Sequence, residues 1–146
     1  MARQIVRVKD WRTKLSAHIN TMRPEPFVWG KHDCALWAAS CVEVMTGVDL
    51  AAPVKGKYST PQGAYKSIKK YYDVDQISEL MKKLFGEPIH AANIRPGDIA
   101  FVKVNFAGFD YALGICNGAH SFFVTENLNS LAMMDTLQVD GGFRVG

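Results

Sequence analysis

Residues 109–125 read FDYALGICNGAHSFFVT, and this stretch decides how the second half of the chain folds. Two blocks rich in apolar and aromatic residues lie on either side of Asn117-Gly118. Asn-Gly between two such blocks is the strongest short-range signal for a β-hairpin, with these two residues at the centre of the turn. The sequence therefore predicts a pair of antiparallel strands over 109–116 and 119–125.

The periodicity of apolar residues changes near residue 90. After that point they alternate or form short blocks, which predicts further strands over 99–104, 128–134 and 142–145. Before it they recur at helical spacing, which predicts helices over about 11–22, 33–46, 61–72 and 75–85. Helices followed by an antiparallel meander indicate an α+β domain, with N-terminal helices packed on a C-terminal antiparallel sheet.

Length, charge and composition exclude several classes of protein. The chain has 146 residues, which fits a single domain over 1–146, and 48% of them are hydrophobic. No apolar run approaches the roughly 20 residues of a membrane span, and the first residues show no secretory signal. The net charge of +3 is too small to indicate nucleic-acid binding. We therefore expect neither a membrane span nor a nucleic-acid partner.

The cysteines indicate the redox compartment and whether a metal site is expected. Cys34, Cys41 and Cys116 cannot all pair with one another, so they are predicted to be free thiols in a reducing compartment. No second Cys/His pair at ligand spacing accompanies His32 and Cys34, and the chain has no glycine-rich phosphate loop. The sequence therefore predicts neither a metal nor a cofactor.

Residues 27–37, FVWGKHDCALW, place Cys34 in the first turn of the predicted helix 33–46, with Asp33 as its cap. The unpaired backbone N–H groups at a helix start favour a thiolate, which lowers the pKa of a cysteine and prepares it as a nucleophile. Cys34 also begins the apolar stripe of this helix, as a buried structural cysteine would. Spacing alone leaves both interpretations open.

Several short motifs follow one another in a recognisable order. They are Trp29-Gly30-x-x-Asp33-Cys34, the loop Gly56-Lys57-Tyr58, Pro96-Gly97-Asp98-Ile99-Ala100, Leu113-Gly114-Ile115 and Phe143-Arg144-Val145. In this order they resemble the NlpC-type cell-wall peptidases, and more closely a phage-encoded branch of that superfamily, over about residues 11–145. The resemblance implies a papain-like α+β fold.

The resemblance also implies a Cys–His enzyme that cuts peptide bonds in peptidoglycan, with Cys34 as the nucleophile. In active relatives, a histidine that opens a His-Val-Gly-Ile strand takes the proton of the thiol. The matching stretch begins at Ala112, so an alanine occupies the position of the base. Because alanine cannot accept a proton, catalysis needs another histidine.

His120, on the next predicted strand, is the first candidate for this base. The predicted turn pairs it with Ile115 and pairs Ala112 with Phe123, which puts His120 and Ala112 on opposite faces of the sheet. If Ala112 marks the face toward Cys34, His120 points away, and the position that would orient a base is apolar. A shift of one residue in register would reverse this conclusion.

His32 is the second candidate for the base. It reaches the sulfur of Cys34 only if the chain folds back before the helix, and otherwise it is an exposed loop histidine. With either histidine as base, the chain is an active cysteine endopeptidase that opens the cell wall during phage entry. Asp33 then caps the helix and helps to position the base.

The other function that the sequence supports is a phage virion component in the tail tip or hub, with degenerate catalysis. Such a subunit is assembled in the host cytoplasm, and its partners are other tail proteins and peptidoglycan. An enzyme needs a groove with a polar lining that leads to Cys34, whereas a virion subunit needs an exposed apolar patch. Residues 105–109, NFAGF, supply such a patch unless they pack over the sheet.

Overall fold

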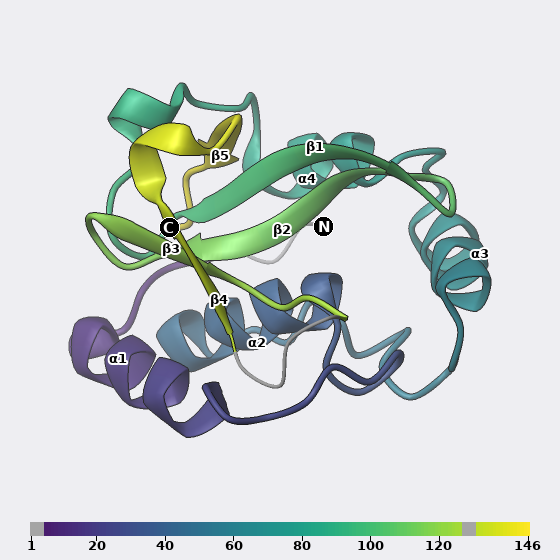
Figure 1. Cartoon of the computed structure of the whole chain (residues 1–146), viewed down its shortest axis with the longest axis horizontal. Helices are drawn as coiled ribbons and strands as arrows, with labels where there is room; N and C mark the ends of the chain where they lie inside the picture. The colour runs from purple at the N-terminus through teal and green to yellow at the C-terminus, as the bar shows by residue number, and fades with distance from the viewer. Residues whose placement is uncertain (1–4, 127–130) are drawn as a thin grey trace.

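The computed structural model describes residues 5–126 and 131–146 of the chain. Within these ranges, the helices come first, as predicted (Figure 1). They are α1 (Trp11–Met22), α2 (Cys34–Thr46), α3 (Pro61–Tyr72) and α4 (Ile77–Phe85). Two short 3₁₀ turns lie in the second half of the chain, η1 (Ala91–Asn93) and η2 (Thr136–Gln138).

Caps and glycines set the helix boundaries. Asp33 caps α2, and Gly47 ends it in the left-handed conformation with φ 78°. Thr60 caps α3, which has a proline in its first turn. α4 begins two residues later than predicted, because Gln76 is still extended, with φ −138°.

The strands form an antiparallel sheet in the order β4-β3-β2-β1-β5. They are β1 (Ile99–Phe106), β2 (Phe109–Cys116), β3 (His120–Phe123), β4 (Ala132–Asp135) and β5 (Gly141–Phe143). Residues 128–130 of the predicted strand 128–134 lie outside the described residues. N-terminal helices packed on a C-terminal antiparallel sheet confirm the predicted α+β class.

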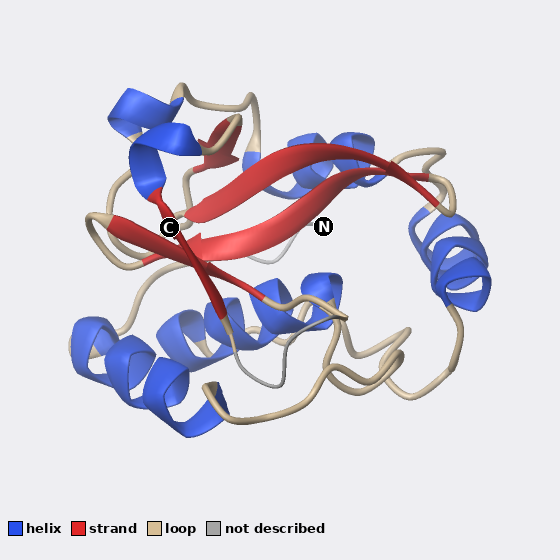
Figure 2. Cartoon of the chain, in the orientation of Figure 1, coloured by secondary structure: helices blue, strands red, loops and turns tan. Residues whose placement is uncertain are grey.

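The main core lies between the helices and one face of the sheet (Figure 2). Trp37 of α2 is fully buried there, and its indole N–H donates to the carbonyl of Phe122 in β3 at 2.9 Å. On the other face of the sheet, Ala100 packs in a smaller cluster with residues of η1 and of the segment after η2. None of the helices in the described ranges has the length and apolar character needed to cross a membrane.

The pairing of β2 with β3 differs from the prediction by two residues, and the turn between them is centred one residue later. Cys116 pairs with Ser121, so the centre of the turn is Gly118-Ala119 rather than Asn117-Gly118. The N–H of Asn117 donates to the carbonyl of His120 at 2.9 Å, which closes the turn. Gly118 has φ 100°, the positive value that the first central position of a type II′ turn requires.

A shift of two residues changes the partners but not the faces of the side chains. Along β2, Leu113 and Ile115 lie in the core beside the helices. Ala112 pairs with Val102, which packs against the cluster on the other face. Leu113 and Ile115 therefore face the helices, as Phe109 does, whereas the side chain of Ala112 lies on the other face.

Candidate functional site

The turn that carries Cys34 is held by the buried carboxylate of Asp33, which is 1% exposed. One oxygen accepts from the backbone N–H of Leu36 at 3.0 Å, and the other accepts from the N–H of Gly30 at 3.0 Å. The hydroxyl of Tyr58 also donates to this second oxygen, at 2.6 Å. The predicted cap is confirmed. These bonds engage the carboxylate with backbone and a tyrosine rather than with a histidine.

Tyr58 is the residue of this turn whose contacts sequence reasoning missed. Its motif, 56–58, was visible only as part of the family resemblance, because 25 residues separate Tyr58 from Asp33. Burial raises the pKa of the Tyr58 hydroxyl, and the charge of Asp33 raises it further, so the hydroxyl stays protonated and donates. The loop 56–58 lies close to Gly30, because the carbonyl of Gly30 accepts a hydrogen bond from the N–H of Gly56 at 3.0 Å.

Cys34 borders a groove of about 170 Å³ at one end of the β1–β2 hairpin. Its other lining residues are Phe27, Trp29, Val104, Phe106, Phe109, Tyr111, Ala112, Val124, Thr125 and Glu126. The ring of Trp29 stacks on those of Phe106 and Phe109, with centroids 6.4 Å and 6.5 Å away. The groove is therefore mainly aromatic and apolar.

Two polar groups close the groove on the side after β3. Glu126 accepts from the indole N–H of Trp29 at 3.2 Å, and Thr125 lines the groove beside it. The prediction put the apolar Phe123 opposite Ala112, but Phe123 pairs with Gly114. The two-residue shift in the pairing of β2 with β3 accounts for this difference, so the sequence offered no signal for Thr125 and Glu126.

The sequence left open whether the hairpin tip 105–109 is an exposed apolar patch or packs over the sheet, and the structure shows one part of each. Phe106 is 49% exposed on the wall of the groove, whereas Phe109 is buried in the core. Ala107 and Gly108 form the turn between them with positive φ. Only part of the predicted apolar patch is therefore exposed, and that part belongs to the groove.

The thiol of Cys34 is not activated by its position at the start of α2. Burial, followed by the charge of the neighbouring Asp33 carboxylate, raises the pKa of Cys34 from 9.0 to about 11. Backbone N–H groups, including that of Leu113, lower the pKa but do not compensate. Burial and the Asp33 carboxylate thus shift the pKa of Cys34 in the direction opposite to the one expected for a thiol at a helix start, although the side chain is still partly exposed.

The two candidate bases lie away from this groove. His120 begins β3, where it is exposed and pairs with Asp135. His32 is 5% exposed, so the prediction of an exposed loop histidine is wrong; its ring lies edge-on to Trp37 with centroids 6.0 Å apart. Of the groove residues that the structure describes, none is a histidine. Nor do the described residues contain a cluster of three His, Cys, Asp or Glu side chains that would hold a metal.

Residues 6–145 match the sequence profile of a family described as a domain of unknown function, DUF6950. The chain belongs to the DUF6950 family. Its structure is similar to that of RipD from Mycobacterium tuberculosis, described as a non-catalytic NlpC/p60 domain protein with an adaptation to peptidoglycan-binding function. The two share 14% identity with a TM-score of 0.47, over 94% of this chain and 98% of RipD. No curated protein matches the sequence.

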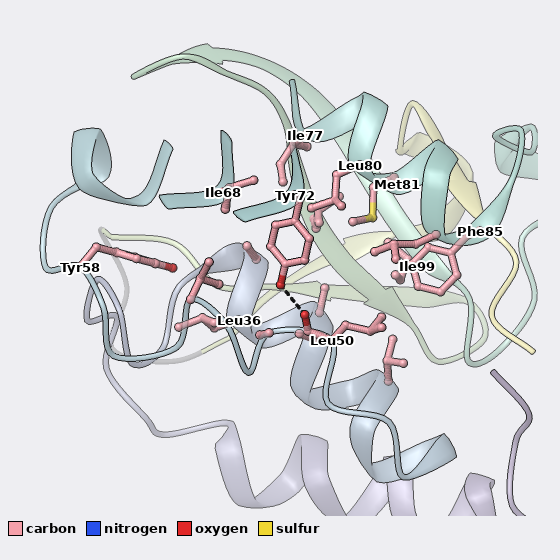
Figure 3. A pocket seen from close by; sticks show the side chains of 18 residues that line it. Leu36, Leu50, Tyr58, Ile68, Tyr72, Ile77, Leu80, Met81, Phe85 and Ile99 are labelled. Carbon is pink, nitrogen blue, oxygen red and sulfur yellow. Dashed lines mark hydrogen bonds between the residues drawn. The ribbon is translucent and has the colours of Figure 1, made fainter. Parts of the chain in front are cut away.

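A separate apolar cavity of about 50 Å³ lies elsewhere in this DUF6950 chain, between α2, α3, α4 and the loop 50–58 (Figure 3). Leu36, Ile68 and Leu80 are among its lining residues. Its polar groups include the hydroxyl of Tyr72, which donates to the carbonyl of Leu50. This cavity is not part of the candidate site, because Cys34 does not line it.

The buried histidines of this DUF6950 chain should make its stability depend on pH. Burial lowers the pKa of His32 and of His18 below the ordinary 6.5. The unfolded chain therefore binds more protons than the folded chain below about pH 6.5. The contribution of these groups to the free energy of unfolding is complete above that pH and is lost as pH falls.

Replacing His32 with leucine should reduce the pH dependence of the free energy of unfolding between about pH 7 and pH 5. Urea titrations at several pH values measure this dependence. His120→Leu, at an exposed position, is the matched control and should keep the slope of the wild type. An unchanged slope in His32→Leu would show that His32 is not held neutral by burial.

Proposed function

We propose that this DUF6950 chain is a binding domain with degenerate catalysis, built on an NlpC-like fold, and that it is a phage virion component of the tail tip or hub. The observation that carries the proposal is the groove beside Cys34. By the resemblance, Ala112 occupies the position that a histidine has in active relatives, and the described lining of the groove contains no histidine. Such a groove can hold a ligand, but its described lining has no histidine that would activate the thiol.

The protonation state of Cys34 supports the same conclusion. A cysteine attacks as the thiolate, but a pKa of about 11 keeps this thiol protonated at neutral pH. Asp33 bonds to backbone N–H groups and Tyr58, and so is not positioned to orient a base. An active cysteine endopeptidase, the alternative function, therefore has neither a thiolate nor a histidine base in the described part of this groove.

Aromatic side chains give the groove its binding chemistry. Phe106 is half-exposed, Trp29 stacks on it, and Glu126 adds a carboxylate. Aromatic faces beside the carboxylate of Glu126 suit a ligand that has both apolar surface and hydrogen-bond donors or an amine. The sugars and peptides of peptidoglycan have these properties, so we assign peptidoglycan to the groove.

Contacts with other tail proteins are assigned to a different surface. Met133 lies on the edge strand β4 and Leu137 in η2, and they are 59% and 70% exposed. Exposed apolar side chains on an edge strand favour contact with another chain. The resemblance to a phage-encoded branch supports the virion as the location, with assembly in the host cytoplasm.

Incubation with purified, insoluble peptidoglycan tests the proposed binding. The wild type should sediment with peptidoglycan and should release no more soluble fragments than Cys34→Ala. Phe106→Ala should lose most of the bound fraction, because it removes the half-exposed wall of the groove. The matched control is Tyr71→Ala, since Tyr71 is 53% exposed on α3 outside the groove.

Three outcomes would overturn parts of this proposal. Fragment release that disappears in Cys34→Ala would establish the peptidase instead. Failure of the wild type to sediment would remove peptidoglycan as the ligand. Mass spectrometry of phage particles released by cells that carry the gene should find the chain at a fixed ratio to tail proteins, and its absence from the particles would contradict the virion location.

A further inference from the structure

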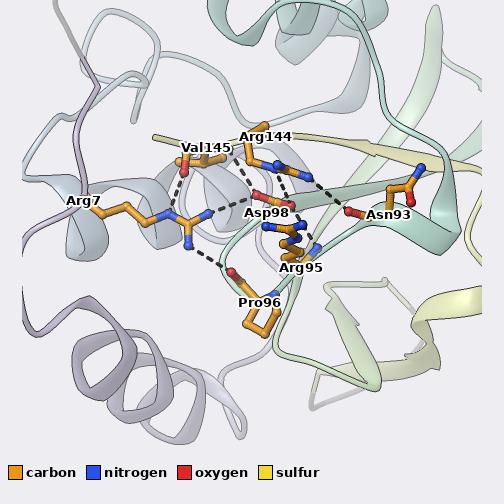
Figure 4. Close-up of polar contacts among 7 residues, drawn as sticks. All are labelled: Arg7, Asn93, Arg95, Pro96, Asp98, Arg144 and Val145. Atoms are coloured by element: carbon orange, nitrogen blue, oxygen red, sulfur yellow. Dashed lines mark hydrogen bonds and ion pairs between the residues drawn. The ribbon is translucent and has the colours of Figure 1, made fainter.

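Asp98, just before β1, holds together three segments that are distant in the sequence (Figure 4). One oxygen of its fully buried carboxylate accepts from Arg7 Nη2 at 3.0 Å and from the N–H of Val145 at 3.3 Å. The other accepts from the N–H of Arg95 at 2.9 Å and from Arg144 Nε at 3.1 Å. The carboxylate thus accepts four hydrogen bonds and has little capacity for a further cation.

The positive charges around Asp98 exceed what this carboxylate neutralises. A cleft of about 380 Å³ is lined by four arginines, Arg7, Arg12, Arg95 and Arg144, together with Pro96, Asp98 and Gly146. Four guanidinium groups against one carboxylate leave three positive charges, and a free carboxylate at Gly146 would leave two. Within the described residues, the guanidinium groups of Arg12 and Arg95 have no hydrogen-bond or ion-pair partner.

Two of the four arginines, Arg7 and Arg12, are held by neighbouring groups. Arg7 donates to the carbonyls of Val145 at 2.6 Å and Pro96 at 3.0 Å. The guanidinium carbons of Arg7 and Arg12 lie 4.2 Å and 4.7 Å from the ring centre of Trp11, within the range of cation–π attraction. The cluster is therefore partly organised before any ligand arrives.

Like charges lie close together in this cluster and affect the pKa of Arg7. Burial lowers the pKa of Arg7, the charge of Asp98 opposes this, and the charges of Arg144 and Arg12 lower it further. An anion in the cleft would relieve this repulsion.

We propose that the cleft binds a phosphate group. Guanidinium groups match the oxygens of a phosphate with paired N–H donors, which explains arginine rather than lysine at this place. The unpaired arginines come from two segments, α1 and the turn before β1, while Arg144 approaches from the C-terminal segment. A tetrahedral dianion can accept hydrogen bonds from several directions at once and balances two charges, whereas a carboxylate balances one.

Calorimetric titration with inorganic phosphate, at constant ionic strength, tests the proposal. Saturable binding at one site is expected, and Arg12→Gln and Arg95→Gln should each weaken it about tenfold, as expected for loss of a charge-assisted hydrogen bond. Both residues are exposed, so the variants should fold. The matched control is Arg23→Gln, because Arg23 is exposed, lies over Phe122 and does not line the cleft; this variant should bind like the wild type.

Two comparison ligands make the test specific. Glycerol phosphate that binds as well as inorganic phosphate would indicate the phosphate group of a larger molecule, and weaker binding would indicate free phosphate. Absence of saturable binding, equal binding of acetate, or an equal loss in Arg23→Gln would overturn the proposal. The cleft and the groove beside Cys34 share no residue, so this outcome is independent of peptidoglycan binding.

Discussion

Replacing Asp98 with asparagine is expected to lower the free energy of unfolding by about 3 kcal/mol, as when one partner is removed from a buried ion pair. The asparagine amide would point a donor at groups that are themselves donors, and it would leave Arg7 and Arg144 without their counter-charge. The side chains of these arginines are 16% and 43% exposed, so water compensates part of the loss. This places the cost at the lower end of the usual range for buried pairs.

Urea denaturation of Asp98→Asn beside Asp75→Asn measures this effect. Asp75 pairs with Lys69 at 3.4 Å, but the two side chains are 74% and 54% exposed. An exposed pair of this kind contributes about 0–1 kcal/mol, so the control should unfold almost like the wild type. If both variants lost the same free energy of unfolding, the buried and fully hydrogen-bonded Asp98 would contribute no more to stability than the exposed Asp75.

The helices and their caps could be predicted because their signals are local. Asp33 and Thr60 each accept a hydrogen bond from a backbone N–H three residues later. Gly47 ends α2 in a conformation that glycine adopts without strain. Each interaction lies within one turn of helix, so the neighbouring residues specify it. The change from helical to alternating periodicity indicated the α+β class in the same way.

The register of the β2–β3 turn depends on a residue from another part of the chain. Thr136 donates from its hydroxyl to the carbonyl of Gly118 and from its N–H to that of Ala119, both at 2.8 Å. These bonds hold the turn at Gly118-Ala119, although Asn117-Gly118 is the stronger local signal. Eighteen residues separate Thr136 from Gly118, so the short-range pattern contains no trace of the contact.

Burial decides the chemistry of the candidate site, and burial is also non-local. The start of a helix lowers the pKa of a thiol by a local effect, but partial burial and the charge of Asp33 raise the pKa of Cys34. His32 is likewise buried beside Trp37 rather than exposed. The arginine cleft depends on contacts between residues as far apart as Arg7 and Asp98, 91 positions along the chain. Sequence reasoning could locate Cys34 but not its surroundings.

Replacing Gly30 with alanine is expected to destabilise the chain by more than about 4 kcal/mol, an exceptional loss for one methyl group. Gly30 has φ 83°, and an added Cβ would lie 1.9 Å from the carbonyl oxygen of Tyr58. This oxygen belongs to the backbone, so the loop 56–58 must move away from residue 30. That movement would break the hydrogen bonds that join Tyr58 to Asp33 and Gly56 to Gly30.

Gly47→Ala separates this collision from the cost of the backbone conformation. Gly47 has nearly the same φ, 78°, but an added Cβ would meet no atom within 4 Å. The left-handed conformation alone costs an alanine about 1–2 kcal/mol, so Gly47→Ala should remain folded and lose only this amount in urea denaturation. If Gly30→Ala fails to fold while Gly47→Ala folds, the collision with Tyr58 is the cause. Equal losses would mean that the loop 56–58 moves freely, and that it does not hold the turn carrying Cys34 in place.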